Sequence, residues 1–250
     1  MQRYFLKQFP KDEHEVLFEG EDVYHISRVM RMNPGDQVYA VFPNNQAAIV
    51  RLENISGTEV TGSIVQWLDE EKELPVDVCI ASGLPKGDKL ELVIQKGTEL
   101  GAARFIPFHA ARSVVKWDDK KANKKRERWT KIAKEAAEQS HRNRVPDVDM
   151  PVSFQKLIEM SNEFTYKIFA FEEVAKKGEA KGFHQVLNKM NEHDKLLIVF
   201  GPEGGLSEKE AESMEQSGFI PCGLGPRILR TETAPLYVLS AISYHFELMR

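Results

Sequence analysis

Two segments near the C-terminal end of the chain combine glycine with charged side chains that could bind or activate a ligand. Residues 201–205 read Gly-Pro-Glu-Gly-Gly and contain Glu203, and residues 224–234 contain Arg230 and Glu232. Glycine allows the backbone to approach a ligand closely and to adopt positive φ values. The carboxylates would repel a polyphosphate, but they suit ribose hydroxyls, an ammonium group or a sulfonium centre. This chemistry favours S-adenosylmethionine over ATP or NAD as the ligand.

The common phosphate-binding motifs are missing from the sequence. No segment reads G-x-x-x-x-G-K-[ST] or G-x-G-x-x-G, so the glycine segments do not predict a nucleoside triphosphate or dinucleotide site. The alternative is that both segments are ordinary turns between a strand and a helix. Ser207 and Glu210 form a capping box, which explains part of the first segment in this way.

The elements around these segments predict where they lie. Each segment follows a short apolar run that is typical of a buried strand, at residues 196–200 and 219–223, and each leads into a helical pattern. From residue 76 onward strands and helices alternate, which is typical of a mostly parallel sheet covered by helices on both faces. Open α/β sheets bind ligands beyond the carboxyl ends of their strands. We therefore expect two adjacent strand ends to present their glycine loops to one ligand.

The first part of the chain has a different pattern. Up to about residue 66 it predicts short strands at residues 37–42, 47–52 and 59–66, with turn residues between them. Closely spaced short strands suggest a small β-barrel. The charged segment that follows residue 66 is typical of an exposed boundary between two domains. We therefore predict two domains, at residues 1–72 and 73–250.

A positive segment interrupts an otherwise acidic chain. The formal net charge is −4, but residues 116–144 hold eleven Lys or Arg against five Asp or Glu. This imbalance indicates a surface for a polyanion such as RNA, and a solvated lysine-rich helix face is the alternative. The predicted RNA contacts are Arg28, Arg31, Lys124, Lys125, Arg128, Arg142 and Arg144.

The two glycine segments together have a specific resemblance. Residues 200–207 read Phe-Gly-Pro-Glu-Gly-Gly-Leu-Ser, and residues 224–234 read Leu-Gly-Pro-Arg-Ile-Leu-Arg-Thr-Glu-Thr-Ala. Further matching motifs lie at residues 95–102, 112–113, 129–140 and 142–146. With them the chain resembles the SPOUT class of methyltransferases, and more closely the RsmE family of 16S ribosomal RNA (uracil-N3) methyltransferases. The resemblance covers essentially the whole chain.

The resemblance implies a fold, a cofactor and partners. It implies a SPOUT-type sheet with a deep trefoil knot, a PUA-like RNA-binding β-barrel at the N-terminal end, and a homodimer whose sites use residues of both subunits. The cofactor would be S-adenosylmethionine, and the reaction would methylate N3 of a uridine in 16S ribosomal RNA of the small ribosomal subunit. Transfer to another RNA base or to a ribose 2′-hydroxyl is the nearest alternative. A non-catalytic RNA-binding assembly factor is another.

The residues expected at the site have two roles. Main-chain groups of the loops would contact the cofactor, at Phe200, Gly201, Gly204, Gly205, Leu224, Gly225, Ile228 and Leu229. Arg112 and Arg230 would anchor a uracil oxygen or a flanking phosphate. Glu203 or Glu232 would accept the N3 proton directly or through water. The alternatives are that Glu203 is a helix-start carboxylate and that Arg230 simply pairs with Glu232.

Composition narrows the classes of protein to which the chain can belong. A chain of 250 residues with 42% hydrophobic content can bury a sizeable core. Its apolar stretches are too short to span a membrane and its charged start lacks a signal-peptide core, so we expect a cytoplasmic protein. Cys79 and Cys222 lie in strand-like runs and predict buried thiols. The histidines form no ligand-like pattern in the sequence, so we assign no metal.

Overall fold

The computed structural model describes residues 1–12, 14–115, 117–172 and 181–249, and the chain divides into two compact units. The first unit comprises Met1–Glu73 together with Ala137–Arg144, and the second comprises Leu74–Ala136 together with Val145–Arg250. The division is not a single cut of the chain, because a short segment far along the sequence belongs with the N-terminal residues. Each unit has a hydrophobic core of its own residues.

The first unit is built on a five-stranded sheet with the order β1-β3-β4-β5-β2. β1 runs parallel to β3, and the other neighbours are antiparallel. Register shifts in the β4–β5 pairing add twist, and Gly62 leaves room for this close packing, since a Cβ there would lie 2.5 Å from the Arg51 carbonyl oxygen. The strands are β1 (Arg3–Phe5), β2 (Glu15–Phe18), β3 (Gln37–Val41), β4 (Ala47–Ile55) and β5 (Val60–Leu68).

Two parts of this unit differ from the sequence prediction. The short strands β1 and β2 were not predicted, because three or four residues carry too little alternation to be recognised. No helix was predicted between β2 and β3, where the chain forms α1 (Glu21–Tyr24) and the π-helical turn η1 (His25–Val29). Val23 and Ile26 are three residues apart on this helical segment, and both are buried in the core of the unit.

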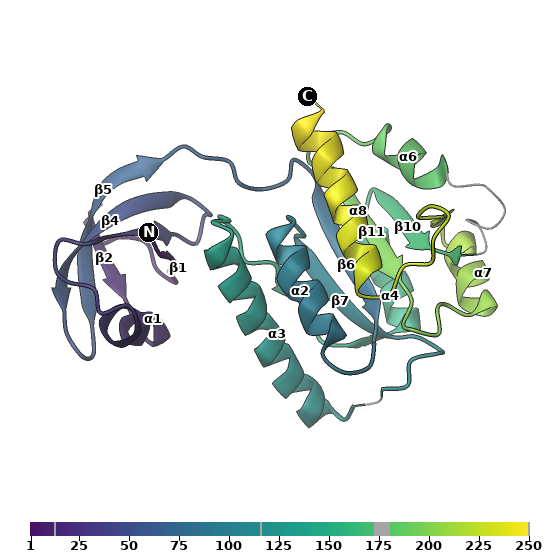
Figure 1. Ribbon diagram of the computed structural model, residues 1–250, viewed down its shortest axis with the longest axis horizontal. Coiled ribbons are helices and arrows are strands. Elements are labelled where there is room, and N and C mark those ends of the chain that lie inside the picture. The colour runs from purple at the N-terminus through teal and green to yellow at the C-terminus, as the bar shows by residue number, and fades with distance from the viewer. Residues whose placement is uncertain (13, 116, 173–180, 250) are drawn as a thin grey trace. The chain divides into compact units, whose positions relative to one another are not determined.

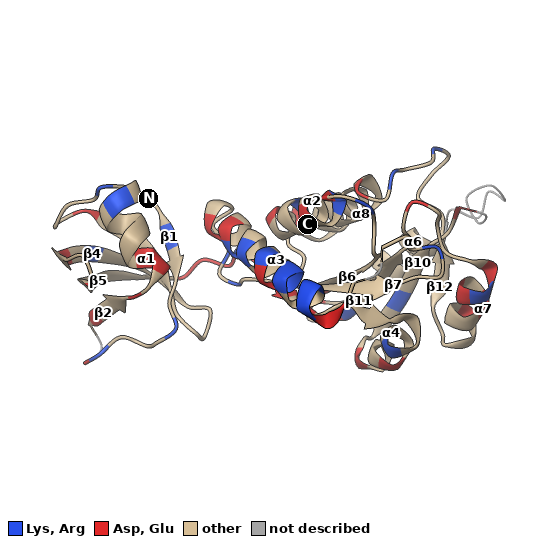
Figure 2. Ribbon diagram, turned by 90° about the horizontal axis from the view of Figure 1, so that it is seen from below, with Lys and Arg blue, Asp and Glu red and all other residues tan. Residues whose placement is uncertain are grey.

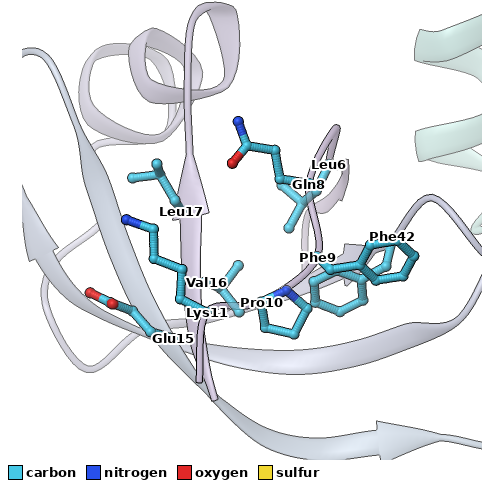
Figure 3. Close-up of a pocket in the computed structure, with 9 residues that line it drawn as sticks. All are labelled: Leu6, Gln8, Phe9, Pro10, Lys11, Glu15, Val16, Leu17 and Phe42. Carbon is cyan, nitrogen blue, oxygen red and sulfur yellow. The ribbon is translucent and has the colours of Figure 1, made fainter. Parts of the chain in front are cut away.

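Close to the start of the chain the first unit has a small hollow, shown in Figure 3. Apolar and polar side chains of the segment after β1 and of β2 surround it. The lining residues are Leu6, Gln8, Phe9, Pro10, Lys11, Glu15, Val16, Leu17 and Phe42. None of them belongs to the glycine segments singled out above.

The second unit contains a parallel sheet with the order β12-β10-β11-β6-β7-β8, and β9 also pairs with β7 (Figure 1). Every pairing within this sheet that the structure describes is parallel, as the sequence predicted. The strands are β6 (Asp77–Gly83), β7 (Arg104–His109), β8 (Asp147–Val148), β9 (Val152–Ser153), β10 (Tyr166–Ala170), β11 (Lys195–Phe200) and β12 (Ile220–Cys222).

Helices cover both faces of this sheet, which confirms the predicted α/β class. Successive strand residues point to opposite faces, so Ile80 and Ile198 join one core while Ala81 and Val199 join the other. The first core includes side chains of α2, α3, α6 and α8, and the second includes side chains of α4 and α7. The helices are α2 (Lys89–Glu99), α3 (Asp119–Gln139), α4 (Phe154–Met160), η2 (Ser161–Glu163), α6 (Lys181–Leu187), α7 (Glu208–Gln216), α8 (Thr233–Ser243) and η3 (Tyr244–Leu248).

The strand order corrects one expectation. The strands that precede the two glycine segments, β11 and β12, are not adjacent, because β10 lies between them. β11 is also inserted between β6 and β10, two strands that come earlier in the chain. This late insertion follows from long-range packing and has no local signal. The trefoil knot itself stays a prediction.

No helix in the described part of the chain is both long enough and apolar enough to cross a membrane. Both cysteines are buried and free of disulfides, with Cys79 in β6 and Cys222 in β12. Burial raises the pKa of the Cys222 thiol to about 12 and also raises the pKa of the Cys79 thiol. The prediction of buried thiols is therefore confirmed.

Candidate active site

The glycine loop after β11 lies against the carboxyl end of β6. The two strands pair in parallel, with Phe200 opposite Ser82. A Cβ on the next residue, Gly83, would lie 2.6 Å from Pro202 Cδ and 2.9 Å from the Pro202 backbone nitrogen. The loop can cross the end of β6 only because Gly83 has no side chain.

The same loop folds back on itself in a tight turn. The Gly205 N–H donates to the Pro202 carbonyl oxygen at 2.8 Å, and Gly205 has a φ of +69°. A Cβ on Gly201 would lie 2.7 Å from the carbonyl carbon of Gly205, so a side chain at position 201 would prevent the turn from closing. Gly201 and Gly205 are therefore required by the backbone geometry.

A hydrogen bond joins the second glycine segment to the first. The Thr231 hydroxyl donates to the Gly201 carbonyl oxygen at 2.8 Å. The second segment runs from β12 to α8 and includes Gly225, which has a φ of +101° and no other atom within 4 Å of a Cβ position. The two loops therefore meet, although β10 separates the strands that carry them.

Glu203, in the first loop, is held by the start of α2. Its Oε1 accepts a hydrogen bond from Lys89 Nζ at 2.7 Å and one from the Lys86 backbone N–H at 3.1 Å. Partial burial acts to raise the pKa of Glu203, but the hydrogen bond from Lys89 and those from backbone N–H groups outweigh it and lower the pKa below its ordinary value. Glu203 is therefore an ionised, hydrogen-bonded carboxylate at neutral pH.

Glu232 begins α8 and has a different environment. Its Oε2 is buried, accepts no hydrogen bond within the described structure, and lies 3.9 Å from Lys89 Nζ. The side chain makes no capping hydrogen bond to its own helix. The ammonium group of Lys89 thus faces carboxylates from both loops, and only Glu203 is hydrogen-bonded to it.

The two candidate arginines lie at the same loops. Arg112 follows β7, and its guanidinium donates to the Gly204 carbonyl oxygen at 2.9 Å. Arg230 is exposed, and its backbone carbonyl accepts the N–H groups of Thr233 and Ala234 at the start of α8. Within the described residues its guanidinium forms no ion pair with Glu232. That alternative interpretation of Arg230 is not seen.

The other residues predicted to contact the cofactor are distributed along the same two segments. Phe200 is buried at the end of β11, whereas Leu224 and Leu229 are half-buried and pack against the first core. Ile228 is 78% exposed, so its large apolar side chain is free to contact a ligand. Gly204 lies against Arg112, since a Cβ there would be 3.1 Å from Arg112 Cβ.

Most of the basic segment forms α3, and Figure 2 shows the Lys and Arg residues of this helix in blue. Trp129 and Ala133 are buried on the apolar side of this helix. Lys124 is exposed, but Lys125 and Arg128 are paired with Glu91 of α2 at 3.1 and 2.6 Å. Part of the positive charge of α3 is therefore neutralised by its neighbour. Lys116, at the start of the predicted segment, lies outside the described residues.

The other predicted RNA contacts lie in the first unit. Arg28 is exposed on η1, Arg31 is exposed just after it with a φ of +50°, and Arg144 is half-buried. Arg142 requires a correction, because its side chain is only 3% exposed and forms an ion pair with Glu73. A buried arginine that is paired with a carboxylate is not available to RNA at the surface.

Comparison with known proteins agrees with the two-part organisation. A family model described as an RNA methyltransferase PUA domain matches residues 18–65, and one described as an RNA methyltransferase domain matches residues 72–243. Over 253 aligned residues the chain is 55% identical to the ribosomal RNA small subunit methyltransferase E of Bacillus subtilis, covering 100% of this chain and 99% of that relative. The chain belongs to the ribosomal RNA small subunit methyltransferase E family. The predicted family is therefore confirmed.

Two solved structures align with nearly the whole chain. The Neisseria gonorrhoeae ribosomal RNA small subunit methyltransferase E bound to S-adenosyl methionine aligns with a TM-score of 0.83 at 28% identity, and the alignment covers 97% of each chain. A putative methyltransferase of Legionella pneumophila, in complex with the cofactor SAM, aligns with a TM-score of 0.84 at 28% identity and covers 96% of each chain.

Sequence patterns missed three residues that build the site of this family member. Gly83 allows the loop to cross β6, Thr231 joins the loops, and Lys89 faces both carboxylates. Lys89 and Glu203 are 114 residues apart in sequence, so periodicity could not connect them. One local signal could have indicated Lys89: it lies in the first turn of α2, which follows the end of β6, where parallel sheets place ligands.

Proposed function

We propose that the protein transfers a methyl group from S-adenosylmethionine to N3 of a uridine in the RNA of the small ribosomal subunit. The observation that carries the proposal is the contact between the two glycine loops, with Thr231 bonded to Gly201 and the carboxylates of Glu203 and Glu232 beside it. The printed names of the family members support ribosomal RNA as the substrate. The choice of uracil N3 rests on the sequence resemblance.

The loops have the features that S-adenosylmethionine requires. Gly205 and Gly225 both have positive φ values, and a Cβ on either would meet no other atom within 4 Å, so open space lies beside their backbones. Backbone groups beside this space suit the adenosine, and the half-buried Leu224 and Leu229 suit its flat apolar ring. Carboxylates at the same loops suit a positively charged sulfur. When bound, this cofactor supplies an activated methyl group.

The protein's own residues have the task of aligning N3 and removing its proton. We assign the anchoring of a uracil oxygen or a neighbouring phosphate to Arg112 and Arg230, whose guanidinium groups lie at the two loops. We assign proton removal to a carboxylate, Glu203 or Glu232. Aligning groups in this way supplies much of the rate in reactions whose leaving group is already activated.

We propose that residues 1–72 serve RNA binding and residues 73–250 serve methyl transfer. The family models matched over residues 18–65 and 72–243 support this division. Exposed cations lie in both parts, with Arg28 and Arg31 in the first and Lys124 in the second, so RNA would also contact the second part. N3 is paired inside an RNA helix, so the target uridine must be unpaired when it enters the site.

We further propose that the protein acts as a homodimer through α8 and η3. Tyr237, Tyr244 and Leu248 are exposed along this helical segment at 46%, 57% and 72%, and their spacing of seven and four residues gathers them on one face. Sedimentation at micromolar concentration should give twice the chain mass. A monomer, with or without the cofactor, would refute the dimer.

The test of the proposed function uses small ribosomal subunits isolated from cells that lack the gene. They are incubated with the purified protein and S-adenosylmethionine, and nucleosides from the digested RNA are analysed by mass spectrometry. We expect 3-methyluridine to appear at one site. A methylated nucleoside of another kind would keep the methyltransferase assignment and refute the N3 position. The absence of any methylated nucleoside would refute the proposed function.

A further inference from the structure

Lys89 has a position that no part of the proposed mechanism has used. It is the first residue of α2, and it lies at the two loops without belonging to either. Its Nζ is 2.7 Å from Glu203 Oε1 and 3.9 Å from Glu232 Oε2. One ammonium group therefore faces the carboxylates of both glycine loops.

The two carboxylates interact differently with the Lys89 ammonium group. Glu203 Oε1 accepts a full hydrogen bond from it and a second hydrogen bond from the Lys86 backbone N–H. Glu232 Oε2 is too far away for a hydrogen bond, and although it is buried, no donor within the described structure satisfies it. A buried carboxylate oxygen without a donor is costly, which suggests that it is kept for a ligand.

The charges around this pair come from several elements. Lys89 comes from α2, Glu203 from the loop after β11, and Glu232 from the segment before α8. Arg112, after β7, donates to the Gly204 carbonyl oxygen of the first loop, and Arg230 lies two residues before Glu232. Without Lys89, the two carboxylates would face each other with no cation between them, and their repulsion would separate the loops.

We propose that Lys89 is a positioning residue for methyl transfer. Its ammonium group holds Glu203, which joins α2 to the first loop. This contact keeps Glu232 Oε2 in place to accept the N3 proton. This inference rests on the proposed function. It also assigns the two carboxylates that sequence reasoning could not distinguish, with Glu203 structural and Glu232 in contact with the substrate.

The proton and electron pairs balance in this arrangement. The N3–H bond of uracil breaks, and its proton goes to Glu232 Oε2 while the electron pair stays on N3. N3 then forms the bond to the methyl carbon, and the carbon–sulfur bond breaks with its electron pair going to sulfur. The positive charge of the sulfonium is lost, the base remains neutral overall, and Glu232 returns its proton to water.

The experiment compares two substitutions of Lys89 with a matched control. Lys89→Met removes the ammonium and keeps an unbranched chain, Lys89→Arg keeps a cation, and Lys86→Met removes a nearby exposed lysine of which only the backbone N–H contacts Glu203. The turnover number and the KM for small subunits are measured for each protein. Thermal unfolding and calorimetric affinity for S-adenosylmethionine are measured in parallel.

We expect Lys89→Met to lower kcat about 100-fold, the size of effect produced by misplacing a reacting group by about 1 Å. The KM for small subunits should stay close to that of the wild type, Lys89→Arg should recover at least part of kcat, and Lys86→Met should retain it. Three results would overturn the inference: full kcat in Lys89→Met, an equal loss in Lys86→Met, or a loss of kcat that follows the melting temperature alone. Wild-type protein that forms no 3-methyluridine would instead refute the proposed function.

Discussion

Thr231 donates its hydroxyl hydrogen to the carbonyl oxygen of Gly201 across 2.8 Å, and this bond joins two loops that follow non-adjacent strands. The two residues are 30 positions apart in sequence. Because the donor is a side-chain hydroxyl, one substitution at Thr231 removes the bond and leaves the main-chain groups of both loops in place. It is therefore a direct way to ask whether the loops act together.

We predict that Thr231→Val weakens the binding of S-adenosylmethionine. Valine has nearly the same shape as threonine but lacks the hydroxyl, so a hydrogen bond worth about 1 kcal/mol is lost and the affinity should fall roughly fivefold. Calorimetric titration measures this change. Thr231→Ser keeps the hydroxyl and serves as the control, with wild-type affinity expected. Equal affinities of the valine and serine variants would show that the loops bind independently.

We predict that the two glutamates differ when each is changed to glutamine. Glu232→Gln removes the proton acceptor and should lower kcat by about 10²- to 10⁴-fold. Glu203→Gln keeps an oxygen that can accept from Lys89 and the Lys86 N–H, so its kcat should fall much less. Single-turnover methylation of small subunits measures both. The reverse order of effects would assign the acceptor role to Glu203.

We predict that acid weakens the contribution of Glu203 to stability. Hydrogen bonds from Lys89 and from backbone N–H groups, acting against partial burial, lower its pKa in the folded protein below the ordinary 4.5. A carboxyl with a depressed folded pKa stabilises the fold above its unfolded pKa and loses this contribution as pH falls through the folded pKa. The difference in melting temperature between wild type and Glu203→Gln should stay constant from neutral pH to 4.5 and shrink below it. A difference that grows in acid would contradict this.

We predict opposite behaviour for two basic residues that the sequence treated alike. Arg142→Ala leaves Glu73 without its cation in a largely buried pair and should lower the unfolding free energy of the first unit by about 3 kcal/mol. Lys124→Ala changes an exposed residue, so stability should be unchanged. RNA affinity should fall in Lys124→Ala, and the slope of log affinity against log salt should decrease by about 0.7 to 0.9. A stable Arg142→Ala protein with weak RNA binding would reverse these assignments.

Local patterns were sufficient to predict much of the second unit. The apolar run at residues 196–200 lies in β11, and the alternation of strands and helices from residue 76 onward forms the parallel sheet and the helices on its faces. Both signals depend only on neighbouring residues and their periodicity. The glycine segments were also predicted correctly as loops, since positive φ values at Gly205 and Gly225 require that residue type.

Contacts between distant residues could not be predicted in this way. The position of β10 between β11 and β12 is decided by how whole βα units pack, which no local pattern records. The same holds for the pairs Lys89–Glu203 and Arg142–Glu73, which are 114 and 69 residues apart. An arginine in a basic segment looks like a surface cation until its partner is known.

Calorimetric titration of the purified wild-type protein with S-adenosylmethionine measures whether the two loops together form its binding site. We expect saturable binding at one site per chain, and a weaker but measurable affinity in Thr231→Val. No detectable binding, either to the protein alone or in the presence of small ribosomal subunits, would contradict it.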